Sequence, residues 1–248
     1  MLNHAYGWRP DLPDQRDKRL SLVPASYPPY VDLRSALPAV YDQGQLGSCT
    51  ANALAGAMQF DQWKEKIPTF MPSRLFLYYN ERVLEGTVDS DAGASLRDGL
   101  KTMVSDGVCP ESAWPYEISQ FAVDPPNAIY GWAAAYKTTS YWSLSQDLLN
   151  LRACLTARYP FVFGFSVYES FESPAVAQTG IVPMPQPQEA LLGGHAVLCV
   201  GYNEARQCFW CRNSWGASWG IDGHFWMPYE YLLSADLASD FWTIRKVA

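Results

Sequence analysis

The pattern of apolar and polar residues divides the chain into a helical front half and a strand-rich rear half. After Ser48, a plausible N-cap, apolar residues stand at almost every position up to Phe60, which predicts a helix buried on nearly all sides. Two further helices are predicted to begin at Ser73 and Ser95, where apolar residues recur with helical spacing. The front half is therefore predicted to be mainly helical.

The rear half contains one predicted helix, around residues 146–157, and is otherwise dominated by strands. Apolar, β-branched and aromatic runs separated by turn residues predict strands at 161–167, 195–202, 207–214, 224–227 and 241–247. A helical lobe followed by an antiparallel β lobe is an α+β arrangement, and clefts commonly form where two such lobes meet. Residues 1–30 contain five prolines and little periodicity, so they are predicted to form an extended arm.

Composition excludes several classes of function. The chain has 248 residues and a formal net charge of −7, which disfavours a nucleic-acid partner. No apolar run predicts a membrane span or a signal peptide, so we expect a soluble protein, either cytoplasmic or exported without a recognisable signal. The six cysteines are scattered through apolar stretches and are expected to be mostly reduced, buried thiols.

Four residues suggest nucleophilic chemistry. Cys49 begins the predicted buried helix, where the helix N-terminus and a nearby imidazolium can lower a thiol pKa to roughly 3.5 to 7.5. Gln43, six residues earlier, can aim its amide at a developing oxyanion beside the backbone N–H of Cys49. His195 and Asn213 supply an imidazole and an amide that fixes its tautomer, and Trp215 can shield their hydrogen bond. Taken singly, a cysteine at the head of a buried helix is more often a small core residue.

The order and spacing of these motifs resemble the papain-like cysteine peptidases. His195 follows Cys49 by 146 residues, close to the separation of roughly 130 to 150 in such enzymes. The similarity covers roughly residues 31–226 and includes Gly44-Gln45-Leu46-Gly47-Ser48-Cys49, Gly194-His195-Ala196-Val197 and Asn213-Ser214-Trp215-Gly216.

The resemblance implies a fold and a set of roles. It implies a two-lobe α+β fold, with a helical lobe at about 31–135, an antiparallel β-barrel-like lobe at about 136–248 and the active-site cleft between them. Cys49 would be the nucleophile, His195 the general base and acid, Asn213 the orienting residue and Gln43 the oxyanion donor. The residues expected to bind substrate are Gly93, Ala94, Gly194 and Trp215. The expected partners are peptide or protein substrates of a monomeric enzyme.

The chain departs from the family at several points. Leu46 and Thr50 stand where the family usually has Cys and Trp, so the family's disulfide beside the nucleophile cannot form. The thirty residues ahead of Val31, which resembles the start of the mature enzyme, are too few for the family's long helical pro-domain. We hypothesise that this arm lies near or across the cleft as a short pro-segment. The alternative is that it packs on the β lobe or is mobile.

Other motifs are less informative. Cys208-Phe209-Trp210-Cys211 has the spacing of a zinc knuckle, but no second pair of ligands lies nearby in the sequence, and two strand residues three apart point to opposite faces. His4 and His224 are expected to be surface or packing residues. We therefore expect no metal and no organic cofactor.

The sequence leaves more than one function open. The favoured prediction is a cysteine peptidase that forms a thioester on Cys49. A thiol amidase or transpeptidase on the same scaffold is a second possibility, because the attacking residues do not determine whether water or an amine resolves the thioester. A catalytically silent peptide-binding protein is a third.

Overall fold

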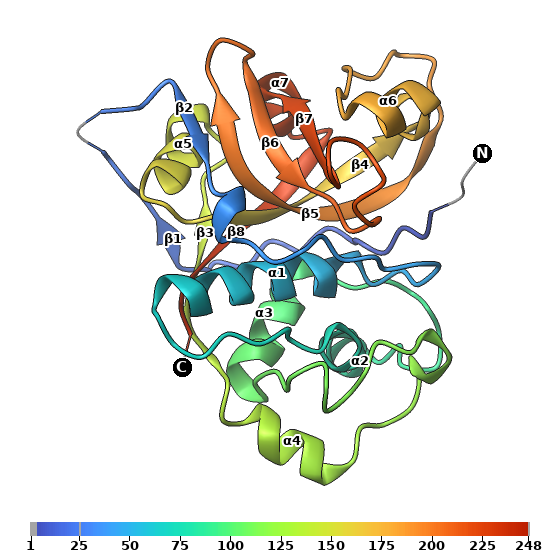
Figure 1. Ribbon diagram of the computed structural model, residues 1–248. Helices are drawn as coiled ribbons and strands as arrows, with labels where there is room; N and C mark the ends of the chain where they lie inside the picture. The colour runs from blue at the N-terminus through green and yellow to red at the C-terminus, as the bar shows by residue number, and fades with distance from the viewer. Residues whose placement is uncertain (1–3, 25, 248) are drawn as a thin grey trace.

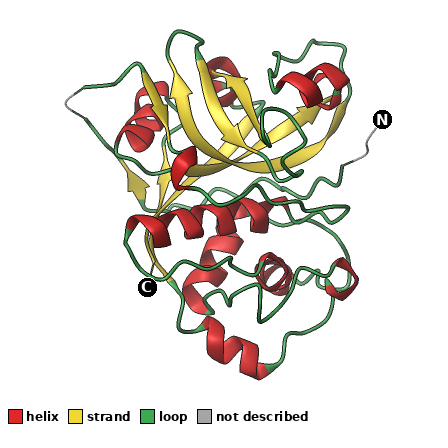
Figure 2. Ribbon diagram, viewed as in Figure 1, coloured by secondary structure: helices red, strands yellow, loops and turns green. Residues whose placement is uncertain are grey.

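The structure, a computed structural model, describes residues 4–24 and 26–247. Two lobes lie one above the other, one built around a curved sheet and the other from helices (Figures 1 and 2). The α-helices are α1 (Cys49–Lys64), α2 (Arg74–Glu85), α3 (Leu96–Ser105), α4 (Asn127–Ala133), α5 (Leu148–Thr156), α6 (Pro174–Thr179) and α7 (Tyr229–Leu233). The strands are β1 (Arg19–Leu20), β2 (Tyr30–Asp32), β3 (Thr138–Leu144), β4 (Phe161–Tyr168), β5 (Leu191–Asn203), β6 (Cys208–Arg212), β7 (His224–Pro228) and β8 (Ala238–Val247).

The eight strands form one sheet in the order β1-β3-β8-β4-β5-β6-β7, with β2 pairing to β5. All neighbouring pairs are antiparallel except β1 and β3. Strand β5 is central: along one edge it pairs with β4 over residues 191–199 and with β2 over residues 201–203, and along the other edge it pairs with β6. The predicted α+β two-lobe fold is confirmed.

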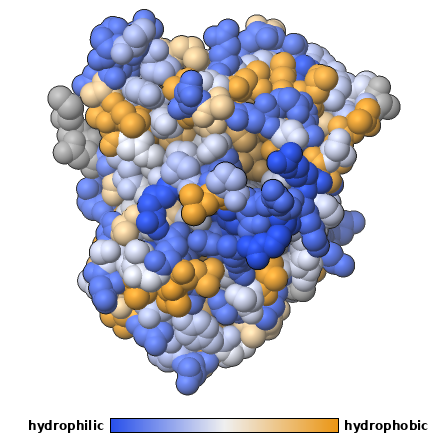
Figure 3. All heavy atoms as spheres, turned by 180° about the vertical axis from the view of Figure 1, so that it is seen from behind, coloured by the Kyte–Doolittle hydropathy of each residue, from blue (hydrophilic) through white to orange (hydrophobic). Residues whose placement is uncertain are grey.

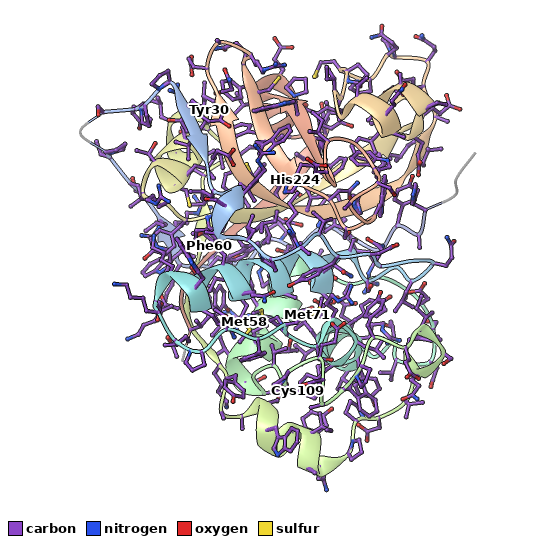
Figure 4. All side chains as sticks on the ribbon, viewed as in Figure 1. Tyr30, Met58, Phe60, Met71, Cys109 and His224 are labelled. Carbon is purple, nitrogen blue, oxygen red and sulfur yellow. The ribbon has the colours of Figure 1, made fainter. Side chains whose placement is uncertain are left out.

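Helix α1 lies between the two lobes and is buried along nearly its whole length. Figure 1 shows it running under the sheet and above the other helices, and Figure 4 labels Met58 and Phe60 on it. Both of these side chains are fully buried. Gly56 faces the sheet, because a Cβ added there would lie 3.4 Å from the side chain of Leu198 on β5. The prediction of an all-round buried helix is therefore confirmed.

The serines that precede the three front helices differ in their capping role, and only Ser48 was predicted as an N-cap. The hydroxyls of Ser73 and Ser95 accept hydrogen bonds from Phe76 N–H and Asp98 N–H, as N-caps do. Ser48 precedes α1 but makes no capping bond, so that prediction is wrong. Its hydroxyl instead lies 2.5 Å from the hydroxyl of Tyr116.

All five predicted strands and the predicted rear helix are present with shifted ends. The strand predicted at 195–202 extends over 191–203, and the one predicted at 207–214 is shorter, at 208–212. The short elements β1, β2, β3, α4, α6 and α7 were not predicted from the apolar pattern. They contain two to seven residues, too few for a clear period.

The surface is mixed in polarity. Seen from behind, hydrophilic residues gather across the middle of the molecule, with apolar residues scattered above and below them (Figure 3). Over residues 4–24 and 26–247, no helix is both long and apolar enough to cross a membrane.

The cap at Ser73 provides a test of the fold. Replacing Ser73 by Ala removes the acceptor for Phe76 N–H and the donor to the Trp114 carbonyl, so we expect the free energy of unfolding to fall by about 1 to 2 kcal/mol. Urea unfolding measures this change. The exposed Ser90 is the matched control, and equal effects of the two substitutions would contradict the prediction.

Candidate active site

Cys49 lies at the first turn of α1, fully buried between the lobes. Its thiol receives hydrogen bonds from the backbone of Ala196, which follows His195 on β5, and of Gly7 in the N-terminal arm. The contact between α1 and β5 thus brings Cys49 and the neighbourhood of His195 together, although they are 146 residues apart in the sequence.

The side-chain amide of Gln43 is held in one orientation. Its Oε1 accepts a hydrogen bond of 2.6 Å from the hydroxyl of Ser214. Its Nε2 is therefore the donor, and it donates to the carbonyl oxygens of Leu46 at 2.9 Å and Ala5 at 3.0 Å. The Ala5 carbonyl belongs to the arm, so a peptide carbonyl already occupies the place to which Gln43 donates.

His195 is oriented by Asn213, which directly follows β6. The His195 Nε2 and Asn213 Oδ1 atoms are 2.8 Å apart. Because Oδ1 also accepts the backbone N–H of Ser214, it is an acceptor, and His195 Nε2 carries the proton. Nδ1 has no hydrogen-bond partner within the described chain and is free to accept a proton. Trp215 stacks on the imidazole with ring centroids 4.8 Å apart, which shields this bond from water.

The N-terminal arm runs through the cleft beside these residues, as Figure 1 shows for the first part of the chain. Ala94 N–H donates to the Gly7 carbonyl at 2.7 Å, and Arg9 N–H donates to the Ala94 carbonyl at 3.0 Å. On the other side, Trp8 N–H donates to the Gly194 carbonyl at 3.0 Å. The arm therefore pairs with both walls of the cleft, and it runs parallel to the chain at Ala94.

Gly93 allows the arm to approach this closely. It adopts a left-handed conformation with φ of 70°, and a Cβ there would overlap the backbone of Gly7. A Cβ on Gly7 would in turn overlap the carbonyl of Gly47. Gly7 of the arm thus lies against Gly93 and Gly47 of the cleft, and no room is left for a side chain between them.

The start of the described arm is anchored by aromatic and charged contacts. The His4 ring stacks on Trp215 with centroids 3.8 Å apart and planes within 5°. Glu172 accepts from the Tyr6 hydroxyl, and its carboxylate lies 3.0 Å from His4 Nδ1. All four residues predicted to bind substrate, Gly93, Ala94, Gly194 and Trp215, therefore contact the arm.

Burial determines the charge state of the site. Burial raises the pKa of the Cys49 thiol to about 11, against the opposing hydrogen bonds from Ala196 and Gly7. Burial also lowers the pKa of His195 to about 4, against the opposing hydrogen bond to Asn213. At neutral pH, the site with the arm in place therefore holds a neutral thiol and a neutral imidazole.

Three residues around the site were missed in the sequence. Ser214, which orients Gln43, stands inside the Asn-Ser-Trp motif and could have been inferred from its place there. Glu172 and Asp240, which accept hydrogen bonds from the arm, are isolated in the sequence and carry no recognisable signal.

The remaining candidates lie apart from this site. His224 packs in the β lobe (Figure 4), with its ring stacked on Trp210. All six cysteines are free, and Cys211 faces Cys199 across β5 and β6. Within residues 4–24 and 26–247, no group of three His, Cys, Asp or Glu side chains is placed to hold a metal ion.

Comparison with known proteins adds a family context. A family model described as papain family cysteine protease matches residues 27–240. Xylellain, a cysteine protease from Xylella fastidiosa, superposes with a TM-score of 0.91 at 46% identity, covering 98% of this chain and 96% of that one. Procathepsin L 3 from the Tenebrio molitor larval midgut has the same fold, with a TM-score of 0.70 at 23% identity over 90% of this chain and 73% of its own.

Curated relatives agree with the structural comparison. A peptidase C1-like protein of Acanthamoeba polyphaga mimivirus is 46% identical over 88% of this chain and 72% of its own length. Digestive cysteine proteinase 1 of Homarus americanus is 28% identical over 84% of this chain. The chain spans 63% of the length of that proteinase.

The charge state of the site leads to a measurable prediction. Because burial raises the pKa of the Cys49 thiol to about 11 and iodoacetamide reaches this buried thiol only when the arm opens, we expect its alkylation to be slow at pH 6 and to rise with pH between pH 6 and 9. Mass spectrometry of the digested protein measures this rate, with the half-exposed Cys208 as an internal reference for reagent activity. Alkylation that is fast and independent of pH over this range would show that a thiolate is present beneath the arm.

Proposed function

Because the chain belongs to the papain family of cysteine proteases, we propose that it hydrolyses peptide bonds through a thioester on Cys49, with His195 as general base and acid. Asn213 keeps the imidazole in the orientation and tautomer that proton transfer requires. Gln43 Nε2–H and the backbone N–H of Cys49 stabilise the oxyanion. The cysteine-type peptidase activity follows from the family, and the roles of the four residues are our proposal.

The proposed reaction proceeds in two stages. His195 Nδ1 takes the thiol proton, and the Cys49 sulfur attacks the substrate carbonyl carbon, so that the carbonyl oxygen becomes an oxyanion. The imidazolium then donates its proton to the leaving amine as the C–N bond breaks and the thioester forms. In the second stage His195 takes a proton from water, the hydroxide attacks the thioester, and the acid product leaves as the proton returns to the sulfur.

The observation that carries this proposal is the position of the Ala5 carbonyl on the Gln43 amide. The arm, an extended segment of this chain, already accepts a hydrogen bond from Gln43 Nε2, the group that we assign as oxyanion donor. It also uses the backbone groups of Ala94 and Gly194 on either side of the cleft. These contacts support extended peptides as the substrates.

We further propose that residues 1–30 are an inhibitory arm and that residues 31–248 form the catalytic domain. Helices α1 to α4 fall within the proposed lobe at 31–135, and strands β3 to β8 fall within the lobe at 136–248. The backbone of Gly7 contacts the Cys49 thiol, and the arm pairs with both walls of the cleft. These contacts support a blocking role for the arm.

No contact favours the alternatives over hydrolysis. A transpeptidase would require an amine in place of water at the thioester, and a silent binding protein would retain the same groups without turnover. The variants below separate a silent protein from an enzyme.

One added methyl group can disturb the fit of the arm in the cleft. Gly7→Ala adds a Cβ that overlaps the Gly47 carbonyl, so the arm should leave the cleft and peptidase activity should rise roughly tenfold or more. Hydrolysis of a fluorogenic peptide mixture measures the activity, and alkylation of Cys49 at pH 7 should accelerate with it. Gly131→Ala on α4 is the matched control, since nothing lies within 4 Å of its Cβ. Equal activity in the two variants and the original chain would reject the inhibitory role.

The four catalytic roles predict graded losses. In the Gly7→Ala background, Cys49→Ala should abolish turnover, and Gln43→Ala should slow acylation by on the order of a hundredfold. Asn213→Ala should cost less than His195→Ala, because it disturbs orientation and not the proton transfer itself. Single-turnover kinetics, with circular dichroism as the check on folding, measures these effects. Undiminished turnover in a folded Cys49→Ala variant would disprove the mechanism.

A further inference from the structure

The peptide group between Leu46 and Gly47 is held at both of its ends by side chains. Its carbonyl, that of Leu46, accepts a hydrogen bond of 2.9 Å from Gln43 Nε2. Its N–H, that of Gly47, donates to the Asp91 carboxylate, whose two oxygens lie 3.0 and 3.1 Å away. A hydrogen bond to a carboxylate is charge-assisted, and it polarises the peptide so that the carbonyl becomes a better acceptor. Asp91 therefore strengthens the bond that orients Gln43.

Asp91 is held in turn by Tyr78 on α2, a fully buried side chain. The Tyr78 hydroxyl donates to Asp91 Oδ1 and accepts the backbone N–H of Gly93 at 3.1 Å. Burial, followed by the hydrogen bond to Asp91, raises the pKa of Tyr78, so its hydroxyl remains a donor at neutral pH. Gly93 directly precedes Ala94, which pairs with the arm. One hydroxyl therefore links the carboxylate to the segment that holds an extended chain.

Arg82, also on α2, supports the loop that follows this helix. Its side chain is fully buried, and its guanidinium lies 4.2 Å from the centroid of the Tyr78 ring. It donates to the carbonyls of Val88 at 2.7 Å and Ser90 at 3.1 Å. No cysteine lies in this loop or in the loop before Cys49, so hydrogen bonds, and not a disulfide, join the two loops.

We propose that Asp91 and Tyr78 are positioning residues for the peptidase reaction, on which this inference rests. Asp91 keeps Gln43 aimed at the oxyanion, and it acts through the peptide group between them. Tyr78 keeps Gly93 in its left-handed conformation, with φ of 70°, from which the N–H of Ala94 faces an extended chain. A single series of hydrogen bonds thus holds the oxyanion donor and the substrate-binding segment in a fixed relation.

The two roles predict different kinetic effects, because one concerns the transition state and the other concerns substrate binding. In the Gly7→Ala background, Asp91→Ala should lower kcat roughly tenfold with little change in KM, since Gln43 loses its alignment with the oxyanion. Tyr78→Phe should raise KM roughly fivefold with a smaller effect on kcat. Asp91→Asn should recover most of kcat, because its Oδ1 can accept from both Gly47 and Tyr78. Initial rates with one fluorogenic peptide measure both constants.

Two matched controls lie in the same lobe. Tyr130→Phe removes a hydroxyl that donates to Asn80 at 2.9 Å, and Asp89→Asn removes one negative charge from the exposed part of the loop after α2. Both should retain the kcat and KM of the Gly7→Ala parent. Losses in these controls as large as those in the test variants would overturn the assignment to Tyr78 and Asp91.

A double-mutant cycle separates positioning from a general loss of stability. If Asp91 acts through Gln43, then Asp91→Ala should cost less than about twofold in kcat once Gln43→Ala is already present. A full and independent loss in that background would overturn the positioning role. Circular dichroism and urea unfolding confirm that each variant is folded under the conditions of the assay.

A probe that needs no turnover tests the same role. The peptide aldehyde acetyl-alanyl-alanyl-alaninal can trap Cys49, because the sulfur bonds to the aldehyde carbon and the thiol proton passes to the aldehyde oxygen. That oxygen then takes the place of the oxyanion. In the full chain with Gly7→Ala, Asp91→Ala should weaken binding of the aldehyde roughly tenfold and leave binding of the matching alcohol, which forms no such bond, unchanged. Tryptophan fluorescence measures both affinities, and equal changes for the two probes would overturn the role of Asp91.

The outcomes distinguish this proposal from the function on which it rests. Aldehyde binding that depends on Asp91, together with no peptide hydrolysis by the Gly7→Ala protein, would support the positioning role and reject the peptidase function. Hydrolysis that depends on Cys49 but is indifferent to Asp91→Ala and Tyr78→Phe would support the peptidase function and reject the positioning role.

Discussion

The buried contact between helix α1 and strand β5 is the constraint on which the rest of the site depends. A Cβ added at Gly56 on the helix would lie 3.4 Å from the side chain of Leu198 on β5 and 3.7 Å from that of Arg212 on β6, so the helix packs against both strands there. At one end of this contact, the backbone of Ala196 reaches the thiol of Cys49. A shift of the helix against the strand would separate the Cys49 thiol from the strand that carries His195, so the catalytic roles that we propose for these two residues depend on close packing between the lobes.

The N-terminal arm occupies the cleft that this packing forms. It satisfies the backbone groups of Ala94 and Gly194 and the amide of Gln43, which are the groups available to an extended peptide. By excluding water it also favours the uncharged forms of Cys49 and His195. The inhibition that we propose is therefore both steric and electrostatic, and it depends on fit at Gly7, where no side chain can be accommodated.

Some elements of the fold could be predicted from the sequence, and others could not. Helix α1 was predictable because apolar residues on all sides of a helix require burial, and β4 because a short apolar run flanked by turns is typical of a buried strand. Strand β1 has two residues and exists only because β3 offers it hydrogen-bonding partners. The failed cap at Ser48 has a similar cause, since its hydroxyl is engaged by Tyr116, 68 residues away.

Asn213 and Gln43 were identifiable because each belongs to a local motif, whereas Glu172 and Asp240 acquire their roles only from the arm that reaches them. Local sequence determined the candidate reactive groups, the helices α1, α2, α3 and α5 and the α+β class, because these depend on side-chain chemistry and on periodicity along the chain. Tertiary structure alone decided that the arm occupies the cleft, that burial neutralises the thiol and imidazole, and that Trp8 meets Asp240. Those features arise from contacts between segments that are not neighbours in the sequence, 38 residues apart for Ala5 and Gln43 and 232 apart for Trp8 and Asp240, and desolvation and steric fit at such contacts have no counterpart in the local pattern.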